Sequence, residues 1–278
     1  MLFETAQYDQ ATKILKLIKY KNSQSYQLRC LYHQNKEAEF QELLDYLIGQ
    51  GDVNPIIGSL ICRAEIKYGF IKPNSFCHDP FKYVLKINLS ESYDFSNTFI
   101  KPVTSIFKQN KRSYRLQKLL TNGSQTPGNL FDIERDLTDE MEKTIRIEIE
   151  KYRNYFKDSE EGFIKKWPAE YSLKAWLINM KSGGKLRPHM HENGWISGSI
   201  YVNVPPKSNT DSGSLVVCID DQDYLVHGKT SNEKIIDVTT GSLCLFPASL
   251  LHYPIPFESE EERIVLAFDV VPKIEKQS

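Results

Sequence analysis

Apolar residues follow a helical period in the first quarter of the chain. They recur every three or four positions, which places them on one face of an α-helix, at Ile14, Ile18, Leu28, Leu31, Phe40, Leu43, Leu44 and Leu47. Asn54 and Pro55 form a typical helix start, because asparagine caps the first turn and proline fits within it. The pattern predicts successive antiparallel helices, the last of them from about Pro55 to Tyr68.

Short polar breaks separate these helices, and together they predict an α-helical repeat-like region. With Tyr8 and Ala11 in the first helix, the rhythm resembles that of tetratricopeptide-type repeats, in which each helix pair packs against the next. Such a region either docks a protein or peptide or serves as a helical cap that stabilises the neighbouring domain. The polar run Ser90-Glu91-Ser92 indicates a boundary, so we expect domains at residues 1–90 and 91–278.

A further helix is predicted in the second half of the chain. Thr138-Asp139-Glu140-Met141 has the form of an N-terminal capping segment. Downstream apolar residues share one face of this helix: Met141, Ile145, Ile149 and Tyr152. We expect this face to pack against a sheet.

Beyond this helix the hydrophobic period falls to about two, which is typical of β-strands. Tyr171 to Met180 is predicted to be a strand, with a turn at Gly183-Gly184 and the next strand entering at Arg187 to His191. Further strands are predicted at Trp195 to Val204, Ser214 to Ile219, Lys234 to Val238, Gly241 to Phe246 and Arg263 to Val271. Many short strands predict a two-layer jelly roll. The expected fold class is α+β, with helices followed by a cupin-like jelly roll that has flanking helices.

Charge excludes one broad class of partner. The 278 residues carry 35 Lys and Arg against 36 Asp and Glu, a formal net charge of −1. A chain so balanced has no overall field that would draw it to nucleic acid or to an anionic membrane, and neither partner is expected. The basic run from Lys108 to Lys118 is expected to be a solvated face.

The cysteines and the hydropathy pattern bear on location. The five cysteines are widely spaced and include no C-x-x-C pair, which argues for a reducing compartment and against a disulfide scaffold. The sequence shows no basic-then-apolar signal pattern and no apolar run of roughly 18 residues. We therefore expect a cytoplasmic protein.

Three of the six histidines form a candidate metal site. His189 and His191 are two residues apart, and in an extended backbone their side chains leave the same face. His252 lies just beyond a predicted buried strand and a turn marked by Pro247. Imidazoles suit iron, zinc, copper or nickel, and a face of three ligands leaves positions open for oxygen and substrate. His227 lies between predicted strands and is expected to be a loop residue.

Arg263 opens the last predicted strand and is a candidate anion-binding residue. An arginine that enters an apolar barrel needs an anion, and its planar guanidinium matches a carboxylate with two hydrogen bonds. The distal carboxylate of 2-oxoglutarate is one such anion. The alternative is an ion pair with a surface acid such as Glu261.

Three motifs resemble those of the non-haem iron(II), 2-oxoglutarate-dependent oxygenases. They are the H-x-H strand His189-Met190-His191, the S-G-x-x-Y-V strand from Ser197 to Val202, and the G-x-L-x-x-F-P-x-x-x-x-H segment from Gly241 to His252. The resemblance covers about residues 171 to 271 and implies a double-stranded β-helix. It also implies that His189 and His252 bind Fe(II), and that Arg263, with Tyr201, binds the cosubstrate 2-oxoglutarate.

One departure from the family pattern leaves the third iron ligand open. The usual motif is H-x-D or H-x-E, whereas the matching position here is His191. His191 is then a third neutral ligand, or Glu192 bends in to ligate, or water fills the position. We favour His191, which makes His189, His191 and His252 the expected metal-binding and catalytic residues.

The resemblance implies an oxygenase that couples decarboxylation of 2-oxoglutarate to hydroxylation of an aliphatic C–H bond. We expect a protein or peptide substrate of the prolyl, asparaginyl or aspartyl type, docked by the N-terminal helices, with Trp176, Trp195 and Tyr201 as walls of the site. One alternative is a three-histidine cupin dioxygenase that does not use 2-oxoglutarate, in which Arg263 has no role. The other is a non-catalytic cupin-like module that binds a structural metal or none.

Overall fold

The computed structural model describes residues 5–18, 22–109, 118–207, 210–220 and 232–273. The chain forms two compact units, the first of residues 1–79 and 159–167 and the second of residues 80–158 and 168–278. The division predicted at residue 90 lies inside the second unit, and it stays a prediction about independently folding domains. His227 and most of the basic run, including Lys111, Arg112 and Arg115, fall outside the described residues.

The first unit is helical, as the sequence predicts. Its helices are α1 (Tyr8–Leu17), α2 (Ser23–His33), α3 (Glu37–Gly49), α4 (Pro55–Tyr68) and the short α8 (Gly162–Lys165). Helix α4 is confirmed with its predicted start, because Asn54 Oδ1 accepts a hydrogen bond from the Ile57 backbone N–H at 3.1 Å. Gly69, at φ 74°, ends this helix in the left-handed conformation that glycine favours. The resemblance of the first unit to tetratricopeptide repeats stays a prediction.

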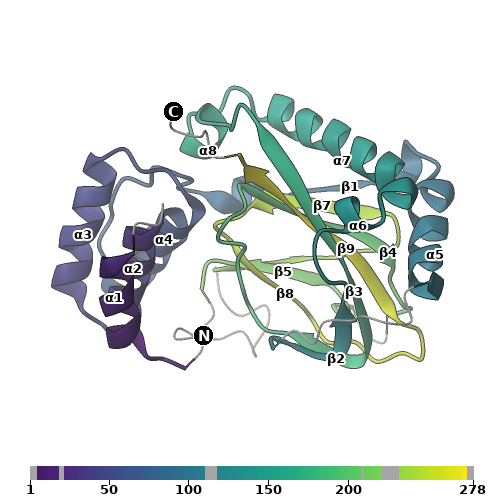
Figure 1. Ribbon diagram of the computed structural model, residues 1–278, viewed down its shortest axis with the longest axis horizontal. Helices are drawn as coiled ribbons and strands as arrows, with labels where there is room; N and C mark the ends of the chain where they lie inside the picture. The colour runs from purple at the N-terminus through teal and green to yellow at the C-terminus, as the bar shows by residue number, and fades with distance from the viewer. Residues whose placement is uncertain (1–4, 19–21, 110–117, 208–209, 221–231, 274–278) are drawn as a thin grey trace. The chain divides into compact units, whose positions relative to one another are not determined.

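The second unit is built on two antiparallel sheets (Figure 1). The larger has the strand order β1-β7-β4-β9-β3-β2 and the smaller the order β6-β5-β8. The strands are β1 (Leu85–Asn88), β2 (Leu120–Gln125), β3 (Tyr171–Leu186), β4 (Ile196–Asn203), β5 (Leu215–Cys218), β6 (Glu233–Ile236), β7 (Ser242–Pro247), β8 (Leu251–Pro254) and β9 (Arg263–Pro272). The chain passes from one sheet to the other several times after β4, and an isolated bridge joins His189 to His252 in β8. The predicted jelly roll is confirmed.

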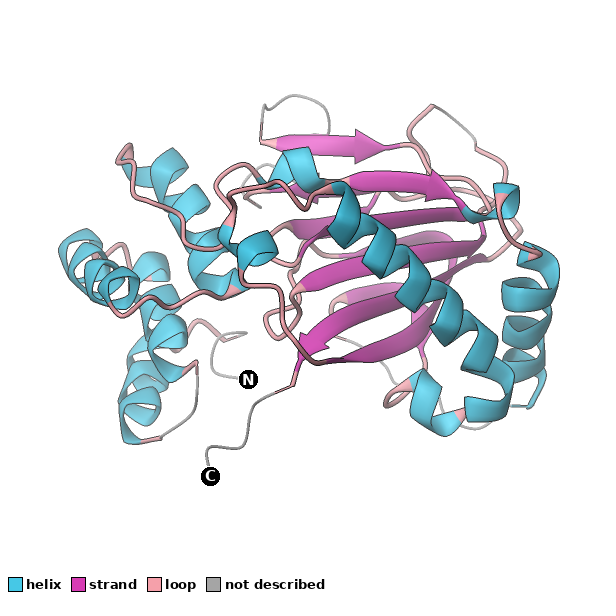
Figure 2. Cartoon of the chain, turned by 90° about the horizontal axis from the view of Figure 1, so that it is seen from above, coloured by secondary structure: helices cyan, strands magenta, loops and turns pink. Residues whose placement is uncertain are grey.

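The second unit also contains helices, and the longest of them packs on the larger sheet. The second unit contains η1 (Pro80–Tyr83), η2 (Leu89–Glu91), the π-helical turn η3 (Ser96–Ile100), α5 (Lys101–Gln109), α6 (Leu130–Ile133) and α7 (Arg135–Tyr155). Figure 2 shows the long helix α7 running across one face of the sheet. Its predicted apolar face is buried, with Met141, Ile145, Ile149 and Tyr152 each at most 1% exposed. None of the described helices is long and apolar enough to span a membrane.

The predicted start of α7 is wrong. The helix begins at Arg135, so Thr138 lies inside it rather than at its cap. The Thr138 hydroxyl donates to the carbonyl of Glu134, four residues back, at 3.0 Å. Threonine can make this bond within a helix as well as cap a helix, and the sequence pattern alone does not separate the two roles.

The predicted turn at Gly183-Gly184 is also wrong, because β3 continues through these glycines to Leu186. Thr121 of β2 pairs with Lys185, whereas Gly123 pairs with Met180, so the residues between Met180 and Lys185 form a bulge opposite Asn122. Gly183 has φ +68°, and its N–H donates to the Phe257 carbonyl at 2.7 Å. The two glycines therefore lie in a β-bulge and not in a turn, and a bulge is a common place for glycine in a strand.

Gly198 of β4 allows Phe268 of β9 to pack against the strand. The two residues are cross-strand partners, and a Cβ at Gly198 would lie 2.2 Å from Phe268 Cζ. We expect Gly198→Ala to lower the free energy of unfolding by about 1–3 kcal/mol, the usual effect of overpacking. Urea unfolding measures the loss. Gly49→Ala is the control, since its Cβ would meet nothing within 4 Å. A Gly198→Ala protein as stable as wild type would contradict this packing.

Candidate active site

Three histidines that are separated in the sequence lie close together beside strand β8. His189 and His191 lie in the segment that links β3 to β4, and His252 lies in β8. The backbones of His189 and His252 exchange hydrogen bonds, N to O, of 3.3 and 2.9 Å. This bridge fixes the two residues side by side, although they lie far apart in the sequence.

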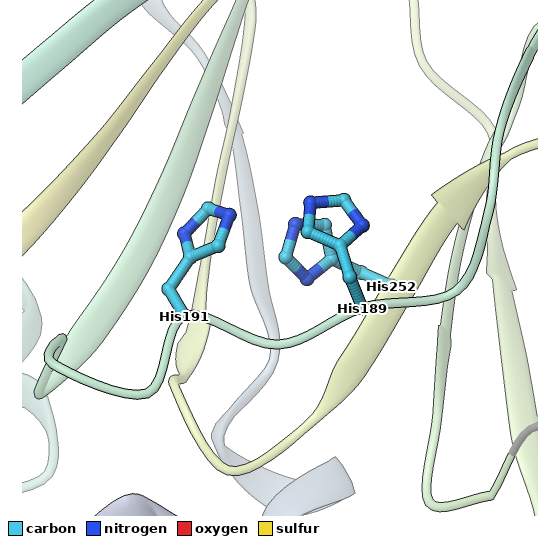
Figure 3. A group of neighbouring side chains, drawn as sticks. All are labelled: His189, His191 and His252. Carbon is cyan, nitrogen blue, oxygen red and sulfur yellow. The ribbon is translucent and has the colours of Figure 1, made fainter. Parts of the chain in front are cut away.

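The three imidazole rings point toward one another (Figure 3). Ring centroids lie 4.4 Å apart for His189 and His252, 4.7 Å for His191 and His252, and 5.2 Å for His189 and His191. One nitrogen from each ring lies within 4.8 Å of the other two, so that the group could hold a metal ion. In the described part of the chain, this candidate metal-binding group contains no carboxylate, and Glu192 is not a member of it.

Hydrogen bonds select which ring nitrogen faces a metal. His189 Nδ1 lies 2.9 Å from the Arg187 carbonyl oxygen, which only accepts, so Nδ1 carries the proton. His191 Nδ1 donates in the same way to Asp269 Oδ1 at 2.6 Å. In both rings Nε2 therefore keeps its lone pair for a metal. His252 Nδ1 is buried and has no hydrogen-bond partner among the described residues.

Desolvation keeps two of these rings neutral. Burial, followed by the neighbouring His191, lowers the pKa of His189 below that of a free histidine. Burial also lowers the pKa of His252, with smaller contributions from His189 and His191. The unperturbed value is already about 6.5, so both rings are neutral near pH 7 and offer lone pairs. Imidazole nitrogen donors with open coordination positions suit a divalent metal such as Fe(II).

Arg263 is a buried cation that no acid among the described residues neutralises. Its side chain is 4% exposed, and its Nε donates to the Gly213 carbonyl at 3.2 Å. Its guanidinium lies 5.0 Å from the ring centroid of Tyr201, and Nη1 lies 3.9 Å from Met180 Sδ. None of the ion pairs within the described ranges involves Arg263, so the alternative pairing with Glu261 is not formed. A buried guanidinium in this setting favours an anionic ligand.

Tyr201 lies beside Arg263 and belongs to a core cluster that reaches His252. Burial raises the pKa of Tyr201, which stays a neutral phenol and accepts a hydrogen bond from Ser199 Oγ at 3.2 Å. Tyr201 packs in one core cluster with Phe246, whose ring centroid is 5.0 Å from that of His252. The candidate cosubstrate residues and the candidate metal ligands therefore share the interior of the jelly roll.

A family model matches the part of the chain that holds these residues. The model describes the Putative 2OG-Fe(II) oxygenase family and matches residues 174–269, which include the three histidines, Tyr201 and Arg263. This segment is a 2OG-Fe(II) oxygenase domain. Its metal cofactor is Fe(II), and its cosubstrates are 2-oxoglutarate and dioxygen.

Solved structures of distant proteins resemble the chain that carries this oxygenase domain. A Pseudomonas putida prolyl-4-hydroxylase is 10% identical, with 78% of this chain and 99% of that chain covered and a TM-score of 0.47. A Trichoplax adhaerens prolyl hydroxylase, solved with a hypoxia-inducible-factor peptide, is 12% identical. The match covers 81% of this chain and 92% of that chain, with a TM-score of 0.49. HygX from Streptomyces hygroscopicus, solved with nickel and 2-oxoglutarate, is 9% identical. The match covers 72% of this chain and 88% of that chain, with a TM-score of 0.44. A search of curated proteins found none with significant sequence similarity.

The structure adds residues that the sequence motifs of the oxygenase domain do not contain. Trp176, predicted as a wall, lies against His191 with ring centroids 5.2 Å apart, and Trp195 is buried. Asp269, the hydrogen-bond acceptor of His191, was not predicted to have a role. The sequence does contain a signal for Asp269, because it is the single acidic residue in the otherwise apolar run from Ile264 to Val271. A buried acid needs a specific partner.

Proposed function

We propose that His189, His191 and His252 bind Fe(II), and that Arg263 and Tyr201 bind 2-oxoglutarate, in an enzyme that hydroxylates an aliphatic C–H bond. The observation that carries the proposal is the three-histidine group itself, whose candidate ligand atoms all lie within 4.8 Å of one another. The match to the oxygenase family favours this function over a non-catalytic module. The buried Arg263 favours it over a three-histidine dioxygenase that does not use 2-oxoglutarate.

Each protein group has a defined part in this proposal. Fe(II) with 2-oxoglutarate supplies the chemistry in which dioxygen oxidises both molecules, so that 2-oxoglutarate becomes succinate and carbon dioxide while a substrate C–H becomes C–OH. The neutral histidines supply lone pairs and leave coordination positions free. Arg263 orients the cosubstrate through its far carboxylate. The buried apolar walls of the jelly roll exclude water from the reacting groups.

The proposed substrate is a protein or peptide with a prolyl, asparaginyl or aspartyl target. Helix α1 of the first unit carries the exposed apolar side chains Ile14 and Leu17, with Ile18 just beyond its end, and Leu17 is 84% exposed. Exposed apolar side chains grouped at one helix support peptide binding there. The proposed location is the cytoplasm, which the five free, buried cysteines support.

Succinate production tests the proposed function. We expect the full chain with Fe(II) to convert 2-oxoglutarate to succinate, and to do so faster when a library of proline-, asparagine- and aspartate-containing peptides is present. Mass spectrometry should then find a peptide heavier by one oxygen atom, which His252→Ala does not produce. Succinate formation that no peptide stimulates would reject the peptide substrate alone. No succinate under any condition would reject the oxygenase.

A further inference from the structure

Asp269 and Ser197 lie behind His191 because of the register of two strands. Ser197 of β4 and Asp269 of β9 are cross-strand partners, so their side chains leave the same face of the sheet. Both are buried, with Ser197 1% and Asp269 8% exposed. On the neighbouring turn, a Cβ at Gly194 would lie 3.1 Å from Asp269 Oδ1, so the chain approaches the carboxylate closely there.

One carboxylate oxygen organises the polar contacts of this site. Asp269 Oδ1 accepts from His191 Nδ1 at 2.6 Å and from Ser197 Oγ at 2.9 Å. Trp176 contacts the His191 ring from another side. His191 lies in a segment outside any strand, so these side-chain contacts, and not a backbone ladder, determine how its ring is oriented.

We propose that Asp269 is a positioning residue that orients His191 and supplies, through its ring, the negative charge that a carboxylate ligand would otherwise provide. This inference rests on the proposed role of His191 as a metal ligand. Three neutral ligands leave the double charge of the metal ion uncompensated. A carboxylate hydrogen-bonded to the far nitrogen of a ligating histidine fixes its tautomer and makes the other nitrogen more basic. Ser197 holds the carboxylate in place.

Direct ligation by Asp269 is the alternative use of this carboxylate. The geometry disfavours it, because Asp269 Oδ1 is hydrogen-bonded to His191 Nδ1 and Asp269 does not belong to the group of three candidate ligands. If Asp269 acts through His191, its effect must vanish when His191 is absent. A double-mutant cycle separates the two uses.

Binding of Co(II) alone, followed by its visible absorption, tests the inference without turnover. The proteins are wild type, Asp269→Asn, His191→Ala and the double variant, each with its thermal unfolding midpoint measured. Asp269→Asn keeps the shape of the side chain but removes its charge, and we expect it to weaken Co(II) binding by about 10–100-fold. In the His191→Ala background the same change should have no further effect.

The outcomes distinguish the inference from the proposed function. Unchanged Co(II) affinity in Asp269→Asn, or an equal loss with and without His191, would overturn the positioning role and leave the metal site standing. Wild-type affinity in both His191→Ala and His252→Ala would instead reject the metal site. If Asp269→Asn does not fold, Ser197→Ala takes its place in the cycle, with a smaller loss expected and an unchanged affinity overturning the inference.

Discussion

Replacing His252 by alanine is expected to abolish Fe(II) binding and all 2-oxoglutarate turnover above background. The change removes one of three ligand nitrogens from a group that, within the described residues, has no carboxylate to replace it. The loss of affinity should exceed the roughly 10–100-fold typical of residues that only support a ligand. Equilibrium dialysis with Fe(II) under anaerobic conditions measures binding, and succinate formation measures turnover.

The folded structure should survive this change. The bridge between residues 189 and 252 uses backbone atoms, which alanine keeps, and the Nδ1 atom that is lost makes no hydrogen bond to the described part of the chain. His78→Ala is the matched control, because His78 is an exposed histidine of the first unit. If His252→Ala retains Fe(II) as tightly as the His78→Ala control, His252 is not a ligand.

Arg263→Ala is expected to weaken 2-oxoglutarate binding by about 3 kcal/mol, a hundredfold change in the dissociation constant. Arg263 is buried beside Tyr201, and its hydrogen-bond acceptors there are a neutral carbonyl and a thioether. In the Arg263→Ala protein, a bound carboxylate of 2-oxoglutarate would therefore have no positive partner at this buried position. Titration of the Fe(II) protein with 2-oxoglutarate measures the dissociation constant, and Fe(II) affinity should be unchanged.

Two further variants test the specificity of this effect. Arg263→Lys keeps the positive charge but loses the planar pair of donors, so an intermediate affinity is expected. Arg146→Ala removes an arginine of α7 that pairs with Glu142 on the surface, and it should leave 2-oxoglutarate binding unaffected. Equal affinity in Arg263→Ala and wild type would exclude Arg263 from the cosubstrate site and revive a dioxygenase that does not use 2-oxoglutarate.

Local patterns in the sequence predicted the elements and the histidines well. The capped helix predicted from about Pro55 to Tyr68 is confirmed, because Asn54 and Pro55 act on the helix start through their immediate neighbours. His189 and His191 lie two residues apart in the sequence, so one short segment was enough to pair them. The three histidines come together as expected, since the jelly roll places β8 beside the segment that carries the pair.

Features that depend on contacts between distant strands were not predicted. Asp269 meets His191 only through the pairing of β4 with β9, a register set by the whole sheet. The glycines at 183 and 184 indicate either a turn or a bulge, and the choice depends on β2, a strand far away in the sequence. Threonine has two hydrogen-bonding roles in a helix, and the one that Thr138 takes follows from the start of α7 at Arg135.

Anaerobic titration of the Fe(II)-loaded protein with 2-oxoglutarate shows whether the three histidines and Arg263 form one site for metal and cosubstrate. Chelation of Fe(II) by the 2-oxo acid produces a weak visible charge-transfer band, which reports metal and cosubstrate at one site. We expect the band in wild type, its loss in His252→Ala, and a need for far more 2-oxoglutarate in Arg263→Ala. A wild-type protein that retains no Fe(II) and develops no band would contradict the account.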